Sequence, residues 1–450
     1  MAEGSSPGGE RGALRVLVLS VDIGAGHKMA GQAVCAALER RGPLEVEWVE
    51  ALDYMGSEGG KRAKDTYFKA LRHAPELWGA VYEIQELGDF FRPFSEQVDG
   101  LRIAALVPRV QRFKPDLMLA VHPFGCGLAG ALRREGAWDC PLAAVLTDFD
   151  AHMSWVARGV NLYCCATAEI AAGLEALGLP SGRALATGLP IREPFWGIRD
   201  LPDPREELGL QKDLPVVLLL GGGLGLGPIV ETVAQLVQGE QPLQAVVIAG
   251  RNQALREQAE ALVSSARQPL IVRGFVDDMH AYLRVADLGI GKPGGSTCAE
   301  MLAAGVPLIA LAPIPGQERA NSETLSALGV AREAATPQAA VALASELLAQ
   351  PERLKAMRRR ALEAGRPQAA NAVAAALLAL HVSEQPARPT GSQAVLEQAR
   401  QLAREAKRRL AQDARALEYG TRRALRPLED LTQDAKRELS RLWERFQRGS

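Results

Sequence analysis

The chain has 450 residues, of which 47% are hydrophobic and 23% are charged. These proportions are those of a folded globular protein, and the length predicts two or three domains. The 52 Lys and Arg residues nearly cancel the 53 Asp and Glu residues, which excludes a chain that is basic throughout, such as a histone-like DNA binder. We expect no nucleic-acid partner.

The six cysteines are scattered, with no CxxC pair and no His at metal-ligand spacing. We therefore predict no zinc site, no other metal and no disulfide framework, and a reducing compartment such as the cytosol. The longest uncharged stretches, Leu117–Leu132 and Leu214–Val230, are broken by Gly and Pro. Both fall short of the roughly 20 apolar residues that a membrane span needs.

The first half of the chain alternates strand and helix patterns. After a Gly/Ser/Glu-rich leader (1–12), Leu14–Val21 has the apolar run of a buried parallel strand. A glycine turn, Asp22–His27, leads into the Ala-rich helical pattern of Lys28–Arg41. Lys61–Gln97 also has helical spacing, and short strand patterns follow it. This alternation predicts a doubly wound parallel sheet over residues 13–190.

A second half of similar design follows a proline-rich linker, Gly188–Pro204. Val216–Leu220 is a predicted strand, Gly221–Gly227 a glycine loop, and Pro228–Val237 a helix that Pro opens. Further strand patterns and a last Ala/Leu helix complete it. We expect a second Rossmann-like domain over residues 191–382.

The C-terminal part differs in composition. Residues 383–393 form a polar, Pro-containing linker, and residues 394–450 carry 14 basic against 9 acidic side chains. Apolar residues recur there every three or four positions, and Pro427 interrupts the predicted helix. Two interpretations stay open: a solvated helix pair or short coiled coil, and a basic amphipathic helix that lies on anionic lipid.

Two glycine turns carry candidate chemistry. A strand, a glycine loop and a helix, as at Gly221–Gly227, place backbone N–H groups against an anion. No acidic residue about 20 positions later ends a second strand, so a phosphate cradle is favoured over a dinucleotide site. The turn Asp22–His27 puts a histidine at the carboxyl end of the first strand, where ligands bind in open α/β sheets. The alternative for His27 is a helix-capping or merely exposed residue.

Several separated motifs resemble a known family. In the second half these are GFVDDM, KPGGSTCAE (Lys292–Glu300) and PGQERAN (Pro315–Asn321). In the first half, DIGAGH (Asp22–His27) and TDFDAHMSWV (Thr147–Val156) agree in order. From about Leu14 to His381 the chain is similar to glycosyltransferase family 28, the GT-B enzymes related to monogalactosyldiacylglycerol synthase and the processive diacylglycerol glucosyltransferases. The resemblance implies two Rossmann-like doubly wound domains facing a cleft, with a C-terminal helical tail added.

The resemblance implies a site for a UDP-sugar donor in the second half. Glu300 matches the residue that accepts hydrogen bonds from the ribose, and the backbone of Phe275 and Val276 would lie beside the uracil. Gln317 and Glu318 match the pair that binds the sugar hydroxyls. The matching donor positions are Gly222, Gly223, Arg192, Arg251, Phe275, Val276, Gly295, Ser296, Thr297, Glu300, Gln317 and Glu318. A structural salt bridge is an equal interpretation for Arg251.

The resemblance also implies the catalytic group. His27 matches the catalytic-site histidine, which would take the proton of an acceptor hydroxyl as that oxygen attacks the anomeric carbon. Asp148 would orient the acceptor or serve as the base instead, and this assignment stays open. A single displacement inverts the anomeric centre. Such enzymes need no metal and no cofactor, because the UDP-sugar is a substrate.

Acceptor recognition rests on fewer signals. The aromatic and histidine positions assigned to the acceptor lipid are Trp78, Tyr82, Phe91, His122, His152 and Trp155. The leading hypothesis is an inverting transfer of glucose or galactose to a diacylglycerol-type lipid, by a cytoplasmic protein on the inner, anionic face of the cell membrane. The alternatives are another lipid-linked acceptor, a UDP-sugar epimerase on the same scaffold, and a non-catalytic scaffold that acts through its tail.

Overall fold

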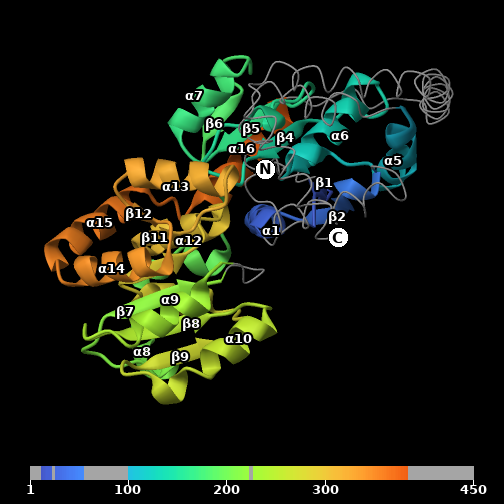
Figure 1. Cartoon of the computed structure of the whole chain (residues 1–450). Coiled ribbons are helices and arrows are strands. Elements are labelled where there is room, and N and C mark those ends of the chain that lie inside the picture. The colour runs from blue at the N-terminus through green and yellow to red at the C-terminus, as the bar shows by residue number, and fades with distance from the viewer. Residues whose placement is uncertain (1–11, 23–25, 55–99, 222–226, 384–450) are drawn as a thin grey trace, which may run out of the picture.

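The computed structural model describes residues 12–22, 26–54, 100–221 and 227–383. Within them the chain forms two parallel six-stranded sheets, each with helices on its faces. We call the part built on β1–β6 the first lobe and the part built on β7–β12 the second lobe. Figure 1 shows the two lobes joined near α12, α13 and α16. The two predicted doubly wound sheets are confirmed.

The first sheet has the strand order β2-β1-β3-β4-β5-β6. β1 pairs in parallel with β2 and β3, and Val18 lies opposite Trp48 on one side and Leu119 on the other. The elements of the first lobe are β1 (Leu14–Ser20), α1 (Gly26–Glu39), β2 (Leu44–Glu50), the short 3-10 helix η1 (Ala51–Tyr54), α5 (Gly100–Phe113), β3 (Leu117–Ala120), α6 (Pro123–Arg134), β4 (Leu142–Val145), η3 (Met153–Trp155), β5 (Leu162–Cys165), α7 (Ala168–Ala176) and β6 (Ala184–Ala186).

The second sheet has the order β12-β11-β10-β7-β8-β9, again with parallel pairs. The linking and second-lobe elements are η4 (Glu193–Phe195), η5 (Ile198–Asp200), α8 (Arg205–Leu208), β7 (Val216–Leu220), α9 (Ile229–Leu236), β8 (Gln244–Ile248), α10 (Gln253–Glu260), η6 (Val263–Ser265), β9 (Leu270–Arg273), α11 (Met279–Val285), β10 (Leu288–Gly291), α12 (Gly295–Ala304), β11 (Leu308–Leu311), α13 (Gln317–Ala327), β12 (Ala331–Ala334), α14 (Pro337–Leu348), α15 (Pro351–Ala364) and α16 (Ala369–Ser383).

Strand alternation divides the core. Along β1, Val16 and Val18 pack on one face of the sheet with α1 and α16, whereas Leu17 and Leu19 pack on the other with α5 and α6. Successive side chains of a strand point to opposite faces, so a run of apolar residues buries both. The core that contains Leu17 continues into the second lobe as far as Ala361.

The last described helix returns to the first lobe. Ala370, Val373 and Leu377 of α16 are buried against Val16, Val34 and their neighbours in that lobe. Arg41, which follows α1, donates from its guanidinium to the side chain and backbone oxygens of Asn371. Residues 369–382, which the sequence assigns to the second domain, therefore cover the sheet of the first (Figure 1).

The structure adds two strands that the sequence does not predict. β6 and β12 lie at sheet edges and read ALA and AREA, without the β-branched run that marks a buried strand. The predicted helix at 61–97, most of the leader and the tail at 394–450 lie outside the described residues.

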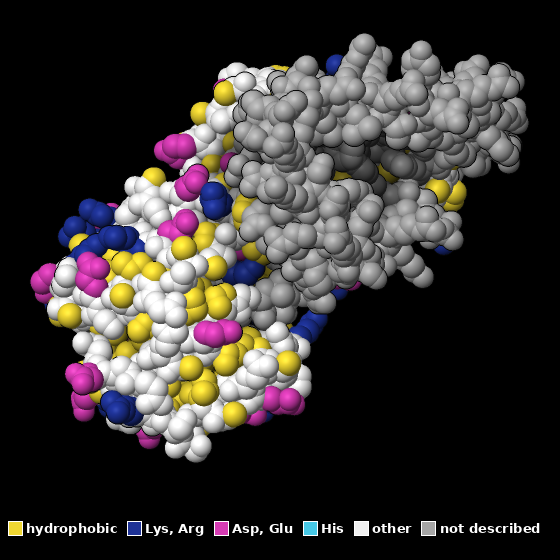
Figure 2. All heavy atoms as spheres, viewed as in Figure 1, with side chains coloured by type: hydrophobic (Ala, Val, Ile, Leu, Met, Phe, Trp, Pro, Cys, Tyr) yellow, Lys and Arg dark blue, Asp and Glu magenta, His cyan; other side chains and the backbone are white. Residues whose placement is uncertain are grey.

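The surface of the second lobe carries charges of both signs. Figure 2 shows Lys and Arg side chains gathered over α15. Much of this charge is locally paired, because Arg353, Lys355 and Arg359 face Glu346, Glu352 and Glu363 within 4.0 Å. In the described ranges no helix combines the length and the hydropathy required to cross a bilayer.

Candidate active site

The strand order locates a switch point in each sheet. Connections run in opposite directions from β1 and β3 in the first sheet, and from β7 and β10 in the second. Ligands of open parallel sheets bind beyond the carboxyl ends of the strands at such points. His27 and His122 follow β1 and β3, while Gly227 and Lys292 follow β7 and β10. These four positions define where each lobe can act on a ligand.

His27 lies in the first turn of α1, and its ring contacts the backbone of Val121, the residue that follows β3. Its Nδ1 is 3.0 Å from the Val121 carbonyl oxygen and 2.8 Å from Thr147 Oγ1. A carbonyl oxygen can only accept, so Nδ1 carries the hydrogen and Nε2 keeps its lone pair. Burial lowers the pKa of His27 to about 4, and the ring is therefore neutral at pH 7. A neutral imidazole of this tautomer can take a proton on Nε2.

His122 packs against the same ring. It is the N-cap of α6, where its Nδ1 accepts from the Phe124 N–H at 3.2 Å. The His27 and His122 ring centroids are 4.7 Å apart in an edge-to-face arrangement. Burial, and then the neighbouring His27, lower the pKa of His122 well below its ordinary value. His122 was predicted to contact the acceptor, and the structure brings it into contact with the predicted base.

Asp148 comes from the loop after β4 and meets the second lobe. Gln317 Nε2 donates to its Oδ2 at 3.1 Å, and Asn321 Nδ2 approaches Oδ1 at 3.4 Å. Burial raises the pKa of Asp148 to about 6, against the lowering effect of the Asn321 hydrogen bond. Its neighbour Thr147 contacts His27. The structure thus brings together both predicted catalytic residues and one predicted sugar-binding residue.

Asn321 of α13 ties this loop to the second lobe. The Phe149 N–H donates to Asn321 Oδ1 at 2.7 Å, and Asn321 Nδ2 donates to the Pro293 carbonyl at 2.9 Å. Thr324 Oγ1 donates to the Phe149 carbonyl at 3.0 Å. The two lobes pack closely here, because a Cβ at Gly295 would lie 1.9 Å from the Thr147 carbonyl oxygen. The helix that begins with Gln317 therefore fixes the loop that contacts the base.

The start of α12 faces the first lobe. A Cβ at Gly26 would lie 2.9 Å from Ser296 Oγ. Gly295, Ser296 and Thr297 form the first turn of α12, whose N–H groups have no partner within the helix. The predicted donor residues Gly295–Thr297 thus lie beside the turn that carries His27.

Glu300, one turn further along α12, is buried with Arg192. Arg192 Nε is 3.9 Å from Glu300 Oε1, and neither atom has a hydrogen-bond partner among the described residues. Burial raises the pKa of Glu300 to about 7, and Arg192 opposes this rise. A carboxyl with an unused oxygen beside a guanidinium can accept hydrogen bonds from a ligand's hydroxyl groups.

The residues predicted to lie beside the uracil, Phe275 and Val276, follow β9 and lie near Arg192. Arg192 Nη1 reaches the Asp277 carbonyl at 3.4 Å, directly after the partly buried Val276. Phe275 is 58% exposed, with the Arg251 guanidinium 5.2 Å from its ring centroid. Arg251 therefore forms a cation–π contact, which stabilises the exposed Phe275 ring.

Glu318 and Lys292 form a second charged pair. Glu318 Oε2 accepts from the Ile314 N–H at 2.9 Å and lies 3.6 Å from Lys292 Nζ. Glu318 is a predicted site residue and Lys292 is not, although a lysine directly after a switch-point strand indicates a ligand site. For Asn321 the sequence predicts only that it holds its own loop, whereas its amide bonds to Phe149 and Asp148 of the first lobe as well as to Pro293 of the second.

Some predicted site residues lie elsewhere. Trp155, which is predicted to contact the acceptor, is a core residue with 2% of its surface exposed. His152 caps η3, where its Nδ1 accepts from the Ser154 N–H at 3.2 Å. The predicted residues outside the described ranges are Gly222, Gly223, Trp78, Tyr82 and Phe91.

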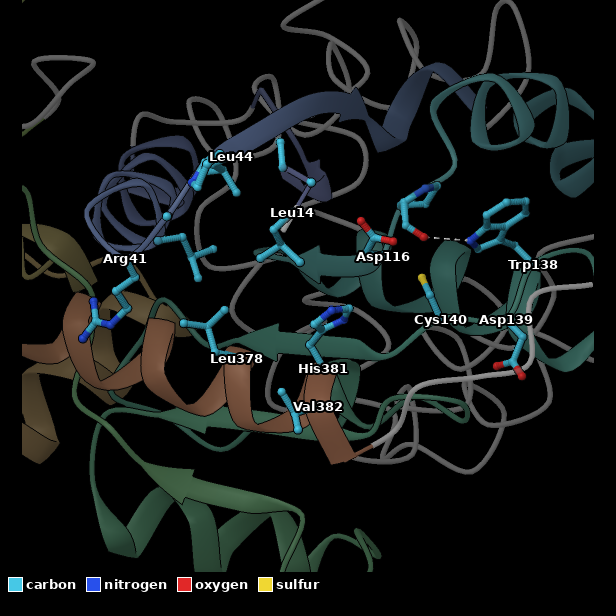
Figure 3. A pocket seen from close by; sticks show the side chains of 16 residues that line it. Leu14, Arg41, Leu44, Asp116, Trp138, Asp139, Cys140, Leu378, His381 and Val382 are labelled. Atoms are coloured by element: carbon cyan, nitrogen blue, oxygen red, sulfur yellow. Dashed lines mark hydrogen bonds between the residues drawn. The ribbon is translucent and has the colours of Figure 1, made fainter. Parts of the chain in front are cut away.

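A separate hollow lies at the opposite end of the first sheet. The volume of this cavity is about 940 Å³. Figure 3 shows its lining, with Leu14 and Leu44 at the amino ends of β1 and β2 and Leu378 and His381 of α16. The candidate residues follow the carboxyl ends of strands. This hollow is therefore not part of the candidate active site.

Comparison with known proteins covers both lobes. Residues 27–191 match the family model for monogalactosyldiacylglycerol (MGDG) synthase, and residues 216–374 match that for the glycosyltransferase family 28 C-terminal domain. "Probable monogalactosyldiacylglycerol synthase 2, chloroplastic" of Oryza sativa subsp. indica is 32% identical over 343 residues, which are 69% of this chain and 68% of that protein. Processive diacylglycerol beta-glucosyltransferase of Bacillus licheniformis is 25% identical over 351 residues, 76% of this chain and 89% of that one.

Solved structures share the fold. MurG of Acinetobacter baumannii aligns with a TM-score of 0.54 at 20% identity, over 81% of this chain and 99% of that chain. UDP-GlcNAc 2-epimerase of Neisseria meningitidis, bound to UDP-GlcNAc, aligns at 0.53 and 14% identity, over 81% and 100%. Identities this low concern the fold alone.

The two facing Rossmann-like lobes and the matched domains define the class: the chain is a GT-B glycosyltransferase. Within that class, the chain belongs to the family of monogalactosyldiacylglycerol synthases and processive diacylglycerol glucosyltransferases.

Proposed function

We propose that this enzyme transfers glucose or galactose from a UDP-sugar to the hydroxyl of a diacylglycerol-type lipid, with inversion at the anomeric carbon. Two named relatives, an MGDG synthase and a diacylglycerol beta-glucosyltransferase, support the lipid class and leave both hexoses open. The enzyme meets its acceptor at an anionic membrane surface on the cytoplasmic side, as a peripheral protein.

One observation carries the mechanism. Neutral His27, with its hydrogen on Nδ1 toward Val121, stands at the switch point of the first lobe and contacts the Thr147–Phe149 loop that the second lobe fixes. Its Nε2 takes the proton of the acceptor hydroxyl, whose oxygen bonds to the anomeric carbon as the bond from that carbon to UDP breaks. General-base help of this kind contributes about 10²–10⁴-fold. Asp148, bonded to Gln317, orients the acceptor hydroxyl.

The second lobe holds the donor. Glu300 accepts hydrogen bonds from the ribose hydroxyls, and Arg192 beside it supplies a positive charge near the nucleotide. Gln317 and Glu318 bind the sugar hydroxyls, which discriminates sugars because an unmatched hydroxyl leaves a buried polar group unpaired. The N–H groups at the start of α12 and nearby cations neutralise the departing UDP, so the reaction requires neither a metal nor a cofactor.

A transfer assay tests this proposal. Purified full-length enzyme is incubated with radiolabelled UDP-glucose or UDP-galactose in turn, with vesicles that contain diacylglycerol, and products are separated by chromatography. We expect a diacylglycerol glycolipid from one donor, with the β configuration by NMR. Transfer only to another lipid class would refute the acceptor. Interconversion of UDP-sugars without any acceptor would instead identify an epimerase.

A further inference from the structure

Thr147 lies two residues beyond the end of β4 and contacts the imidazole of His27. Its Oγ1 is 2.8 Å from His27 Nδ1, and only 6% of the threonine is exposed. The Nδ1 hydrogen also points to the Val121 carbonyl oxygen at 3.0 Å. Because Nδ1 carries this hydrogen, Thr147 Oγ1 accepts a share of it. The His27 ring is therefore held at Nδ1 by two acceptors, one after β3 and one after β4.

The hydroxyl hydrogen of Thr147 is left for a further acceptor. A hydroxyl that accepts from Nδ1 keeps its own O–H for donation. The neighbouring Asp148 carboxylate receives it: burial raises the pKa of Asp148 to about 6, and side-chain hydrogen bonds from Asn321 and Thr147 oppose that rise. His27, Thr147 and Asp148 thus form a chain in which each group donates to the next.

The second lobe fixes the backbone of Thr147. A Cβ at Gly295 of α12 would lie 1.9 Å from the Thr147 carbonyl oxygen, so no side chain fits between the two backbones. Two residues further along, the Phe149 N–H donates to Asn321 Oδ1 at 2.7 Å. The position of the Thr147 hydroxyl therefore depends on the contact between the two lobes.

A role in loop structure alone does not account for this hydroxyl. The loop after β4 is already held to α13 through the Phe149 backbone, which bonds to Asn321 and Thr324. Neither contact involves Thr147 Oγ1. The partners of that oxygen are instead the two side chains to which the proposed mechanism gives a chemical role.

We propose that Thr147 is a positioning residue for the base: its hydroxyl holds the His27 ring with the hydrogen on Nδ1 and stabilises the imidazolium that forms during transfer. This inference rests on the proposed function and adds a residue to it. The Thr147 hydroxyl in turn donates to the Asp148 carboxylate, whose negative charge complements the imidazolium.

The transfer step balances without a proton on Thr147. The acceptor hydroxyl gives its proton to His27 Nε2, and its oxygen bonds to the anomeric carbon. The bond from that carbon to UDP breaks, with its electron pair left on the phosphate oxygen. The Nδ1 hydrogen stays on the ring, and its hydrogen bond to Thr147 Oγ1 strengthens as the ring becomes positive.

Steady-state kinetics of Thr147→Val test this role, because valine keeps the branched shape and removes the hydroxyl. We expect kcat to fall about 10- to 100-fold, as for a lost hydrogen bond to a charged group, with KM for the UDP-sugar unchanged within about twofold. Thr147→Ser keeps the hydroxyl and should restore most of kcat. The matched control is Thr232→Val in α9, a buried threonine whose Oγ1 donates to the Pro228 carbonyl at 2.6 Å, and its kcat should not change.

A double-mutant cycle with His27 separates positioning from a structural role. If Thr147 acts through His27, Thr147→Val should lower the residual kcat of His27→Ala by less than about twofold. An equal loss in both backgrounds, unchanged kcat in Thr147→Val, or a Ser variant no more active than the Val variant would overturn the inference.

A second pair of variants covers a folding defect. Should Thr147→Val not fold, Thr147→Ser and Thr147→Ala, which differ only in the hydroxyl, are compared in the same two backgrounds. The inference then expects the Ser variant to be the more active only where His27 is present, and the same kcat for both variants there would overturn it. Absence of hexose transfer by the unmodified enzyme would instead overturn the proposed function.

Discussion

The two lobes share one architecture and differ in the chemistry at their switch points. The first lobe places two neutral imidazoles there, His27 and His122, with pKa values lowered by burial. The second places charged groups there: Lys292 beside Glu318, and Arg192 beside Glu300. A neutral base suits an uncharged alcohol, and fixed charges suit an anionic nucleotide. The same topology therefore supports proton transfer in one lobe and anion binding in the other.

The largest expected effect comes from removing the base of the first lobe. His27→Ala should lower kcat at least tenfold, and by about 10²–10⁴-fold if the whole general-base contribution is lost. UDP affinity, measured by calorimetry, should stay within twofold because the donor binds the other lobe. His381→Ala, a histidine in the hollow of Figure 3, is the matched control and should keep its turnover. Unchanged turnover in His27→Ala would transfer the base role to Asp148.

A somewhat smaller effect should follow when the lobes are uncoupled. Asn321→Leu keeps the size of the side chain but removes the hydrogen bonds that the Asn321 amide makes with the Phe149 N–H and the Asp148 carboxylate. We expect kcat to fall about 10- to 100-fold. Thr324→Val removes one hydrogen bond to Phe149 and should cost less. Steady-state kinetics measure kcat of both variants, and thermal unfolding checks that each is folded. Full activity in Asn321→Leu would show that turnover does not depend on this contact.

A pH effect on nucleotide affinity should arise from Glu300 in the second lobe. The pKa of Glu300 is raised to about 7, so part of this carboxyl is protonated near neutrality and must lose its proton to accept from both ribose hydroxyls. UDP-glucose affinity should therefore rise severalfold from pH 6 to pH 8 and then level off. Glu300→Gln should bind more weakly at pH 8 and lose this dependence. An identical pH profile in the variant would remove Glu300 from the nucleotide site.

The smallest expected effect is that of metal removal. If the cations and helix dipoles of the second lobe neutralise UDP, EDTA should change turnover by less than about twofold. The assay compares dialysed enzyme with and without EDTA, and then with added Mg²⁺ or Mn²⁺. Loss of activity that a divalent ion restores would contradict a metal-free mechanism.

Sequence patterns predict the parts of the molecule that local physics determines. Buried strands such as Leu14–Ser20 have apolar runs, and residues that follow them, such as His27, necessarily lie at the carboxyl edge of the sheet. Edge strands such as Ala331–Ala334 lack that pattern and were missed. The motif Thr147–Val156 does not show by itself that Trp155 is buried in the core.

Contacts between the lobes lie beyond local patterns. Gln317 and Asp148 are 169 positions apart, and Asn321 and Asp148 are 173 apart. No periodicity within either half specifies such a pair, because it depends on how the two sheets approach each other. The return of α16 to the first lobe has the same origin: Ala370 and Val373 would be apolar in either domain.

A crystal structure of the enzyme with UDP bound tests most directly whether nucleotide binding belongs to the second lobe. We expect the ribose hydroxyls within hydrogen-bonding distance of Glu300 and the phosphate oxygens close to the first turn of α12, with no nucleotide atom bonded to His27. Nucleotide bound against the His27–His122 pair, or in the hollow between Leu14 and His381, would contradict it.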